Sequence, residues 1–192
     1  MHLLLLVVVT LLINGLEGRY NNMADWQELN NLSPEALAKV KYNDPRLDSF
    51  ANAVEERYGL PKDLLVAVKN AGERSNTGQV SSAGAKGVMQ FIDKTRKSYE
   101  HDVNDPMDSI DAAGRYFQDL IKQYKGDALA AVAHYNGGSA NGKALLNNKP
   151  LPSQKQTLPY IKRIQDYMEK RSAQQATPPS QLTTSFRLGV SP

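Results

Sequence analysis

The sequence contains no cysteine among its 192 residues. A disulfide framework, a thiolate nucleophile and a cysteine metal site are therefore excluded. Only three histidines are present, and neither His101 nor His134 has metal-ligand spacing with a third residue. We expect no metal site. Strand signals are also weak, and no internal repeat is visible, so an all-α or α-dominated fold is predicted.

The sequence also lacks an apolar run of the roughly 20 residues that a membrane-spanning helix needs. The longest one, Leu3 to Ile13, is interrupted by Thr10 and has no preceding Lys or Arg of the kind that secretory leaders carry. Three interpretations of residues 1–22 stay open. They are a secretory leader, a segment that contacts membranes through residues 3–13, or a stretch before a true start at Met23.

The composition, with 41% hydrophobic and 22% charged residues, is typical of a soluble globular protein of one domain. The net charge of +3 is unevenly distributed. From Lys143 onward, eight Lys or Arg residues face two acids, whereas fifteen basic and eighteen acidic residues precede it. A basic end suits nucleic acid, anionic lipid or a carboxylate-bearing wall polymer, or is simply a solvated face. We predict no specific nucleic-acid binding.

The pattern of apolar residues divides the chain into four parts. Residues 23–44 are predicted to form a helical extension, in which Ser33 caps a helix that Pro34 opens. Residues 45–172 form the main domain. From residue 173 onward, adjacent prolines and the absence of any period predict a flexible tail.

Within the main domain, helical spacing of apolar residues predicts a series of helices separated by glycine and proline. Residues 74–87 are rich in small polar residues and are predicted to form an ordered loop. The predicted helices span residues 47–58, 61–73, 88–98, 106–125, 128–134 and 160–171.

The stretch GERSNTGQVSSAGAKGVMQF, residues 72–91, contains a single acid, Glu73, at the end of an apolar helix. The negative end of the helix dipole and desolvation by groups such as Met89 and Phe91 would both oppose ionisation of this carboxyl. A carboxylic acid that stays protonated near neutral pH can donate a proton to a leaving oxygen. The alternative is a solvated carboxylate paired with Arg74 or Lys69.

Four blocks of sequence, taken together, carry a resemblance to a known family. SSAGAKGVMQF resembles the signature of the lytic transglycosylases with the goose-type lysozyme fold, in which an acid ends the preceding helix. AHYNGG, residues 133–138, is similar to the family's Ala-x-Tyr-Asn-x-Gly block. TLPYIKRI is similar to its Thr-x-x-Tyr-Val segment, and NDPMDSIDAAGRYFQDLIKQY to the helix between the two halves of the site. The blocks occur in the family's order, from Gly59 to about Met168.

The resemblance implies a lysozyme-like α domain with a sugar-binding groove that cleaves the β-1,4 bond between N-acetylmuramic acid and N-acetylglucosamine. Glu73 is carried over as the catalytic acid. No convincing second carboxylate accompanies it, whereas ordinary glycosidases employ a pair. A single acid suffices if the 2-acetamido group of the substrate stabilises the cationic centre, and the product is then a 1,6-anhydro sugar. This chemistry requires no cofactor.

Other site residues follow from the same resemblance. Tyr160 matches a tyrosine beside the acid, although it also fits a core position. Met89 and Gln90 match residues that contact the sugars, and Met89 fits the core equally well. Phe91 is expected to line the groove and to help desolvate the acid. Three further residues are assigned to substrate or to the loop and groove wall: Ser81, Tyr135 and Asn136.

One departure from the family pattern affects the register. The family has Glu followed directly by Ser and a loop one residue longer, so an ungapped alignment places Gly72 where the acid belongs. We place the acid at Glu73 with a shortened loop, because glycine has no acid chemistry. The role of Ser75 stays open.

Two other functions compete with transglycosylation: hydrolysis by a goose-type muramidase, and wall binding without turnover. In each case peptidoglycan strands are the predicted partner. The apolar N-terminus and the basic back half also fit assembly with virion or secretion-complex proteins. We therefore expect action in the periplasm or cell envelope, reached by secretion or as a phage virion component.

Overall fold

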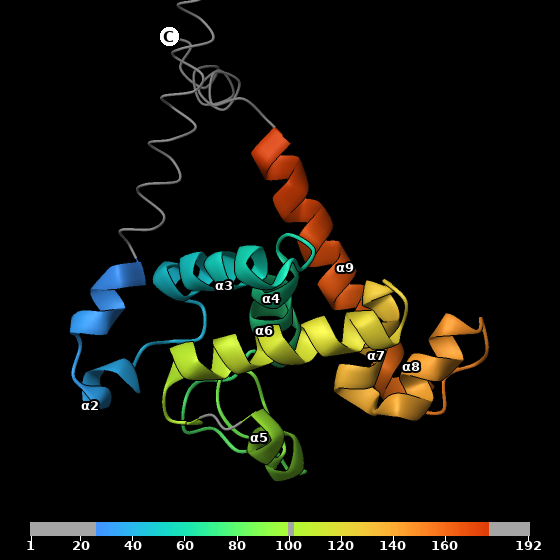
Figure 1. The fold of residues 1–192 in the computed structure, drawn as a ribbon, viewed down its shortest axis with the longest axis horizontal. Helices are drawn as coiled ribbons and strands as arrows, with labels where there is room; N and C mark the ends of the chain where they lie inside the picture. The colour runs from blue at the N-terminus through green and yellow to red at the C-terminus, as the bar shows by residue number, and fades with distance from the viewer. Residues whose placement is uncertain (1–25, 100–101, 177–192) are drawn as a thin grey trace, which may run out of the picture.

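The computed structural model describes residues 26–99 and 102–176, and these residues are dominated by helices (Figure 1). The apolar segment 3–13 and residues 177–192 of the tail predicted from residue 173 lie outside them, so the predictions for these residues stay untested, whereas residues 173–176 belong to the last helix. No helix of the described residues is long and apolar enough to span a membrane. The elements, in order, are η1 Glu28–Asn31, α2 Pro34–Leu37, α3 Pro45–Tyr58, α4 Leu64–Ala67, η2 Val68–Glu73, α5 Asp93–Tyr99, α6 Pro106–Gln123, α7 Ala128–Gly137, α8 Ser139–Leu146 and α9 Gln154–Ala176.

The first helices begin at the predicted caps, although α2 ends at Leu37 and does not continue through the predicted extension to residue 44. The Ser33 side chain accepts a hydrogen bond from the Ala36 N–H at the start of α2, and Asp44 caps α3 in the same way. Gly59 ends α3 in the left-handed conformation, with φ of 63°. Such caps satisfy helix-end groups that would otherwise lack partners.

The centre of the domain is the continuous helical segment formed by α4 and η2. All four residues of α4 are buried, as expected for a helix that is apolar on every side. It packs against α3, α6 and α9. η2 follows α4 without a break. The packing of α4 in the core therefore also fixes the position of the segment that ends at Glu73.

The longest helix of the middle of the chain, α6, is amphipathic and buries one face, which carries Ile110, Ala113 and Phe117. It crosses the molecule beneath α3 in Figure 1 and also packs against α7. At the crossing with α3, a Cβ added at Gly114 would lie 2.4 Å from Cγ1 of Val54. The absence of a side chain at Gly114 therefore sets how closely α3 and α6 approach.

Residues 74–87 form the predicted ordered loop, but the loop continues to residue 92, and the helix expected from Val88 does not begin there. Among the described residues, the β pairing is limited to two isolated bridges, Val80 with Lys86 and Lys86 with Phe91. The second bridge closes a turn over residues 87–90, and α5 begins only at Asp93. This turn buries its apolar residues without helical hydrogen bonds. The spacing of those residues therefore predicted a helix that does not form there.

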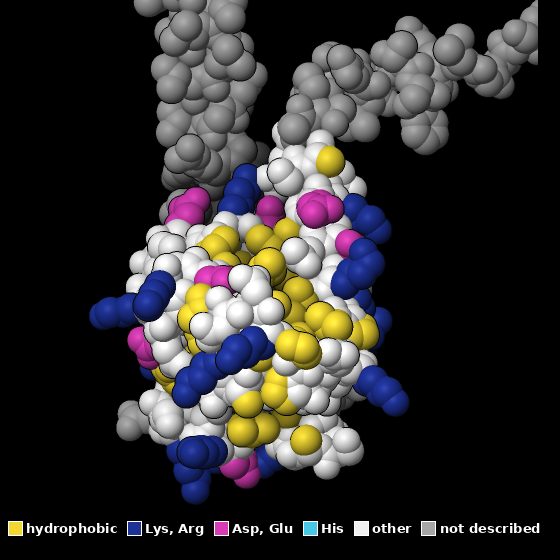
Figure 2. Space-filling model, turned by 90° about the vertical axis from the view of Figure 1, so that its right-hand side faces the viewer, with side chains coloured by type: hydrophobic (Ala, Val, Ile, Leu, Met, Phe, Trp, Pro, Cys, Tyr) yellow, Lys and Arg dark blue, Asp and Glu magenta, His cyan; other side chains and the backbone are white. Residues whose placement is uncertain are grey.

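The last helices are longer than the apolar pattern predicts. α7 runs through Asn136 to Gly137, and α8 follows immediately. α9 begins at Gln154 instead of Tyr160 and reaches Ala176, with Pro159 within it. Figure 2 shows the face at the right-hand side of Figure 1. Hydrophobic side chains gather in the middle of this face, and Lys and Arg side chains lie around them.

Candidate active site

The segment η2 has the wide i to i+5 hydrogen bonding of a π-helix and ends at Glu73. Single π turns of this kind are rare and occur often at functional sites. Arg74 follows in the left-handed conformation, with φ of 51°, so the chain turns sharply after the acid. The Ser75 hydroxyl donates a hydrogen bond to the Glu73 carbonyl oxygen at 3.0 Å. Ser75 therefore stabilises this turn.

The side chain of Glu73 contacts a tyrosine from the far end of the domain. The phenol of Tyr160, on α9, donates a hydrogen bond to Oε1 of Glu73 at 2.5 Å. Tyr160 is only 2% exposed, so its ring is held by its surroundings. Burial and the nearby charge of Glu73 both raise the pKa of Tyr160, which therefore keeps its proton and acts as a donor.

The glycine before the acid is in close contact with the same tyrosine. A Cβ added at Gly72 would lie 2.8 Å from the Tyr160 hydroxyl oxygen and 2.9 Å from two ring carbons. The ring of Tyr160 thus packs directly on the backbone at Gly72, and the next residue presents its carboxyl to the phenol. The packing therefore leaves room only for a glycine at position 72, and the carboxyl that meets the phenol comes from position 73.

Arg163 lies one helical turn after Tyr160 and completes the surroundings of the acid. Its Nε donates a hydrogen bond to the Ala71 carbonyl oxygen at 3.1 Å, and its guanidinium carbon lies 5.7 Å from the centre of the Tyr160 ring. Arginine in this position satisfies a carbonyl at the end of η2 and stacks on an aromatic face. Its positive charge also lowers the pKa of Glu73.

Burial nevertheless dominates the ionisation of Glu73. Desolvation raises its pKa from 4.5 to about 7, and the Tyr160 hydrogen bond and the Arg163 charge offset only part of that rise. No carboxylate of the described residues contributes to the shift. A substantial fraction of Glu73 is therefore protonated at neutral pH, and within the described part of the chain no second carboxylate acts on it.

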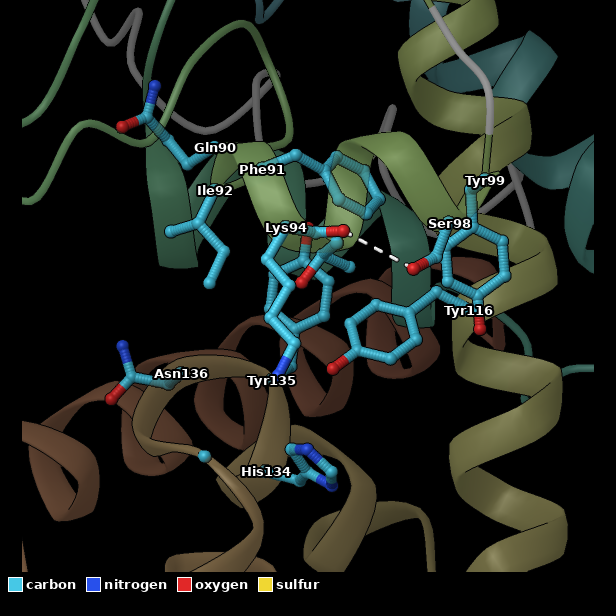
Figure 3. A pocket seen from close by; sticks show the side chains of 12 residues that line it. Gln90, Phe91, Ile92, Lys94, Ser98, Tyr99, Tyr116, His134, Tyr135 and Asn136 are labelled. Atoms are coloured by element: carbon cyan, nitrogen blue, oxygen red, sulfur yellow. Dashed lines mark hydrogen bonds between the residues drawn. The ribbon is translucent and has the colours of Figure 1, made fainter.

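A cavity of about 470 Å³ opens among α5, α6, α7 and the residues before α5. Figure 3 shows Gln90 and Ile92 on one side of it, Tyr99 and Tyr116 on the other, and His134 and Asn136 below. Tyr135 lines the cavity, and burial first, with the charge of Glu73 second, raises its pKa. Glu73 itself is not among the described residues that line this aromatic cavity.

Residues 49–157 match the family model of the transglycosylase SLT domain. The chain belongs to this family. Its members are peptidoglycan lytic transglycosylases, and this protein is an enzyme of that class, with peptidoglycan as its substrate. Since peptidoglycan is a cell-envelope polymer, the enzyme acts there. Tyr160 and Arg163 lie just beyond the matched residues.

The structure of this transglycosylase separates the predicted sugar-contacting residues into two groups. Gln90 and Asn136 line the cavity, and Phe91 forms part of its wall while being 2% exposed. Met89, by contrast, is fully buried, which corrects its expected place in the groove. Its carbonyl oxygen instead accepts a hydrogen bond from the phenol of Tyr135.

Ser81 supports the loop of the transglycosylase. Its hydroxyl oxygen accepts a hydrogen bond from the Ala85 N–H at 3.0 Å. This arrangement agrees with the loop-stabilising alternative. Lys69, considered as a partner of Glu73, instead pairs with Asp48 at 2.7 Å in the interior.

Several residues of the transglycosylase site were missed by sequence reasoning. Ile92 is 46% exposed at the cavity, and Tyr99 and Tyr116 line it. Aromatic residues at helical spacing look the same in sequence whether they face a core or a groove. Arg163 had one usable signal, its spacing of one helical turn from Tyr160.

Proposed function

We propose that the enzyme cleaves the β-1,4 bond between N-acetylmuramic acid and N-acetylglucosamine without water and leaves 1,6-anhydro ends. The observation that carries the proposal is Glu73, an acid with a pKa of about 7 that is hydrogen-bonded to Tyr160 and has no carboxylate partner among the described residues. Paired-carboxylate mechanisms need a second acid. A solitary acid needs help from the substrate.

In the first step, the protonated carboxyl of Glu73 donates its proton to the glycosidic oxygen, and the bond from that oxygen to C1 breaks. The 2-acetamido oxygen of the muramyl residue stabilises the positive C1. Tyr160 donates to Oε1 of Glu73, which leaves Oε2 as the oxygen that carries the transferable proton. After transfer, the same hydrogen bond stabilises the new carboxylate.

In the second step, the carboxylate of Glu73 removes a proton from the muramyl 6-hydroxyl, whose oxygen then bonds to C1. Glu73 thereby regains the proton that it gave up in the first step, and the reaction consumes no water. The nearby charge of Arg163 stabilises the carboxylate between the two steps. The guanidinium lies over the Tyr160 ring, and no ion pair joins it to Glu73 within the described residues.

We further propose that the aromatic cavity binds sugar rings on one side of the acid. Aromatic faces and edges match the apolar faces of sugars, and the Gln90 and Asn136 amides match acetamido and hydroxyl groups. One amide atom supports this assignment. Oδ1 of Asn136 has no hydrogen-bond partner in the structure. An acceptor without a partner is costly unless a ligand or water satisfies it.

Mass spectrometry of digested peptidoglycan tests the proposal. Wild-type enzyme should yield 1,6-anhydromuramic ends, and Glu73→Gln should yield none while keeping its helical circular dichroism spectrum. Reducing muramic ends would instead establish the hydrolytic muramidase. Equal activity of Glu73→Gln would remove Glu73 from the chemistry.

We also propose that this cleavage opens the wall locally, and that residues 3–13 contact the membrane in a virion or secretion complex. These residues lie outside the described part of the chain. Their role is tested by comparing membrane association of the full chain with that of a chain starting at Met23.

A further inference from the structure

A second cavity, of about 540 Å³, lies between the N-terminal extension and the loop that follows Glu73. It is lined by Ala38, Lys39, Lys41, Asn76, Thr77, Gly78, Gln79 and Asn104. No aromatic residue and no acid is among these described residues, in contrast to the aromatic cavity. Two ammonium groups and three side-chain amides therefore dominate its chemistry. Such a lining favours an anion with several oxygens.

The two lysines are held in place by the backbone that carries them. Val40, between them, is only 8% exposed and anchors the turn in the core. The Val40 N–H donates to the Leu37 carbonyl oxygen, and the Lys39 N–H donates to that of Ala36. Lys39 and Lys41 flank this anchor with exposed side chains and have no salt bridge within the described residues. Their charges are thus available to a ligand.

The cavity is also tied to the catalytic segment. The Tyr42 N–H donates to Oδ1 of Asn76 at 2.9 Å, and Nζ of Lys69, in η2, donates to the Tyr42 carbonyl oxygen. Asn76 is three residues after Glu73, so their Cα atoms lie within about 11 Å of each other. Lys39 and Lys41 precede the family match, which begins at residue 49. The extension thus adds charge near a site that the family domain already contains.

We propose that this cavity binds the carboxylates of the peptides that peptidoglycan carries on its muramyl residues. The proposal rests on the proposed function, because it places a glycan strand at Glu73. A muramyl residue without its peptide carries one lactyl carboxylate next to the sugar ring, whereas an attached peptide carries its carboxylates further from the ring, where a cavity beside the groove can reach them. Two ammonium groups beside the loop that follows the acid, without ion-pair partners among the described residues, therefore favour strands that carry peptides over strands that lack them.

The test measures binding, so that it does not depend on turnover. Full-length Glu73→Gln protein is titrated with a soluble muropeptide oligomer and with the same oligomer after an amidase has removed its peptides. The ratio of the two dissociation constants is then measured in three variants that also carry Glu73→Gln, and each ratio is compared with that of Glu73→Gln alone. These are Lys39→Gln with Lys41→Gln, Lys39→Arg with Lys41→Arg, and the control Lys122→Gln with Lys149→Gln. The control removes the same charge from exposed positions that line neither cavity.

The glutamine pair should lower the preference for the peptide-bearing oligomer about five-fold, as expected for two partly exposed ion pairs. The arginine pair and the control should keep it, and raising the salt concentration should weaken it. An unchanged ratio in the glutamine pair, or an equal fall in the control, would overturn the proposal. So would an equal loss of affinity for both oligomers, because the lysines would then bind the glycan. A failure of the proposed function appears separately, as wild-type enzyme that releases no anhydro ends.

Discussion

The phenol of Tyr160 donates a hydrogen bond to Oε1 of Glu73 at 2.5 Å, although 87 residues separate the two. The contact joins the end of the buried η2 segment to the first half of α9. It places a neutral donor, not a cation, directly on the acid. The acid is thereby oriented while burial keeps its pKa near 7.

Tyr160→Phe removes this donor and keeps the ring that packs on Gly72. A hydrogen bond to a charged group contributes about 1.5–3 kcal/mol, so kcat should fall roughly 10- to 100-fold with little change in KM. Release of anhydro-muropeptides, followed by chromatography, measures both constants. Tyr167→Phe is the matched control on α9, because its phenol oxygen accepts from Asn70 and not from the acid. A kcat as low in the control would contradict the role assigned to Tyr160.

Glu73→Gln should stabilise the protein at pH 8 and leave it nearly unchanged at pH 4. The folded-state pKa of about 7 exceeds the ordinary glutamate pKa of 4.5, so the folded state binds more protons between these values and stability falls as pH rises through them. Glutamine carries no charge and escapes this loss, which is on the order of 2–3 kcal/mol. Chemical denaturation at both pH values measures the difference.

Glu55→Gln provides the contrast for this experiment. Burial raises the pKa of Glu55 to about 7 as well, but its oxygens accept hydrogen bonds from the backbone N–H groups of Asp63, Leu65 and Val66. A glutamine amide group cannot accept all of them, so this variant should lose stability at pH 4 and at pH 8. A pH-independent effect of Glu73→Gln would contradict the burial argument for the acid.

Arg163→Met should shift the alkaline limb of the kcat/KM profile upward by about half a pH unit or more. The arginine charge lowers the pKa of Glu73, so its removal raises that pKa and keeps the acid protonated to higher pH. Arg163→Lys retains the charge and should hold the limb near its original position. A limb that moves downward in Arg163→Met would show that the limb reports another group.

Gly72→Ala should disrupt the site through packing alone. The new Cβ would lie under 3 Å from the hydroxyl oxygen and two ring carbons of Tyr160, so the ring or η2 must move. We expect a loss of about 1–3 kcal/mol in unfolding free energy together with a large fall in kcat. Gly126→Ala, with φ of 94° and no atom within 4 Å of the added Cβ, lies in neither cavity and should cost stability without that fall in kcat. Similar kcat values for the two variants would refute the packing argument.

The sequence by itself determined the helical class, the caps at Ser33 and Gly59, and the loop after Glu73. These features depend on local chemistry: periodic apolar residues, capping hydroxyls and left-handed glycine. The blocks around Gln90 and Asn136 also predicted the family, which the family match confirms. The turn at 87–90 was mistaken for helix, because its apolar residues are buried by long-range packing that local spacing does not encode.

Only the tertiary structure decided which neighbours surround the acid. Met89 is buried while the adjacent Gln90 lines the cavity, since the turn there directs consecutive side chains to opposite sides. Arg163 reaches the end of η2, and the lysines of the extension reach the second cavity, from segments far away in sequence. The raised pKa of Glu73 is likewise a tertiary property, because desolvation depends on every atom packed around the carboxyl and not on the residues beside it in the chain.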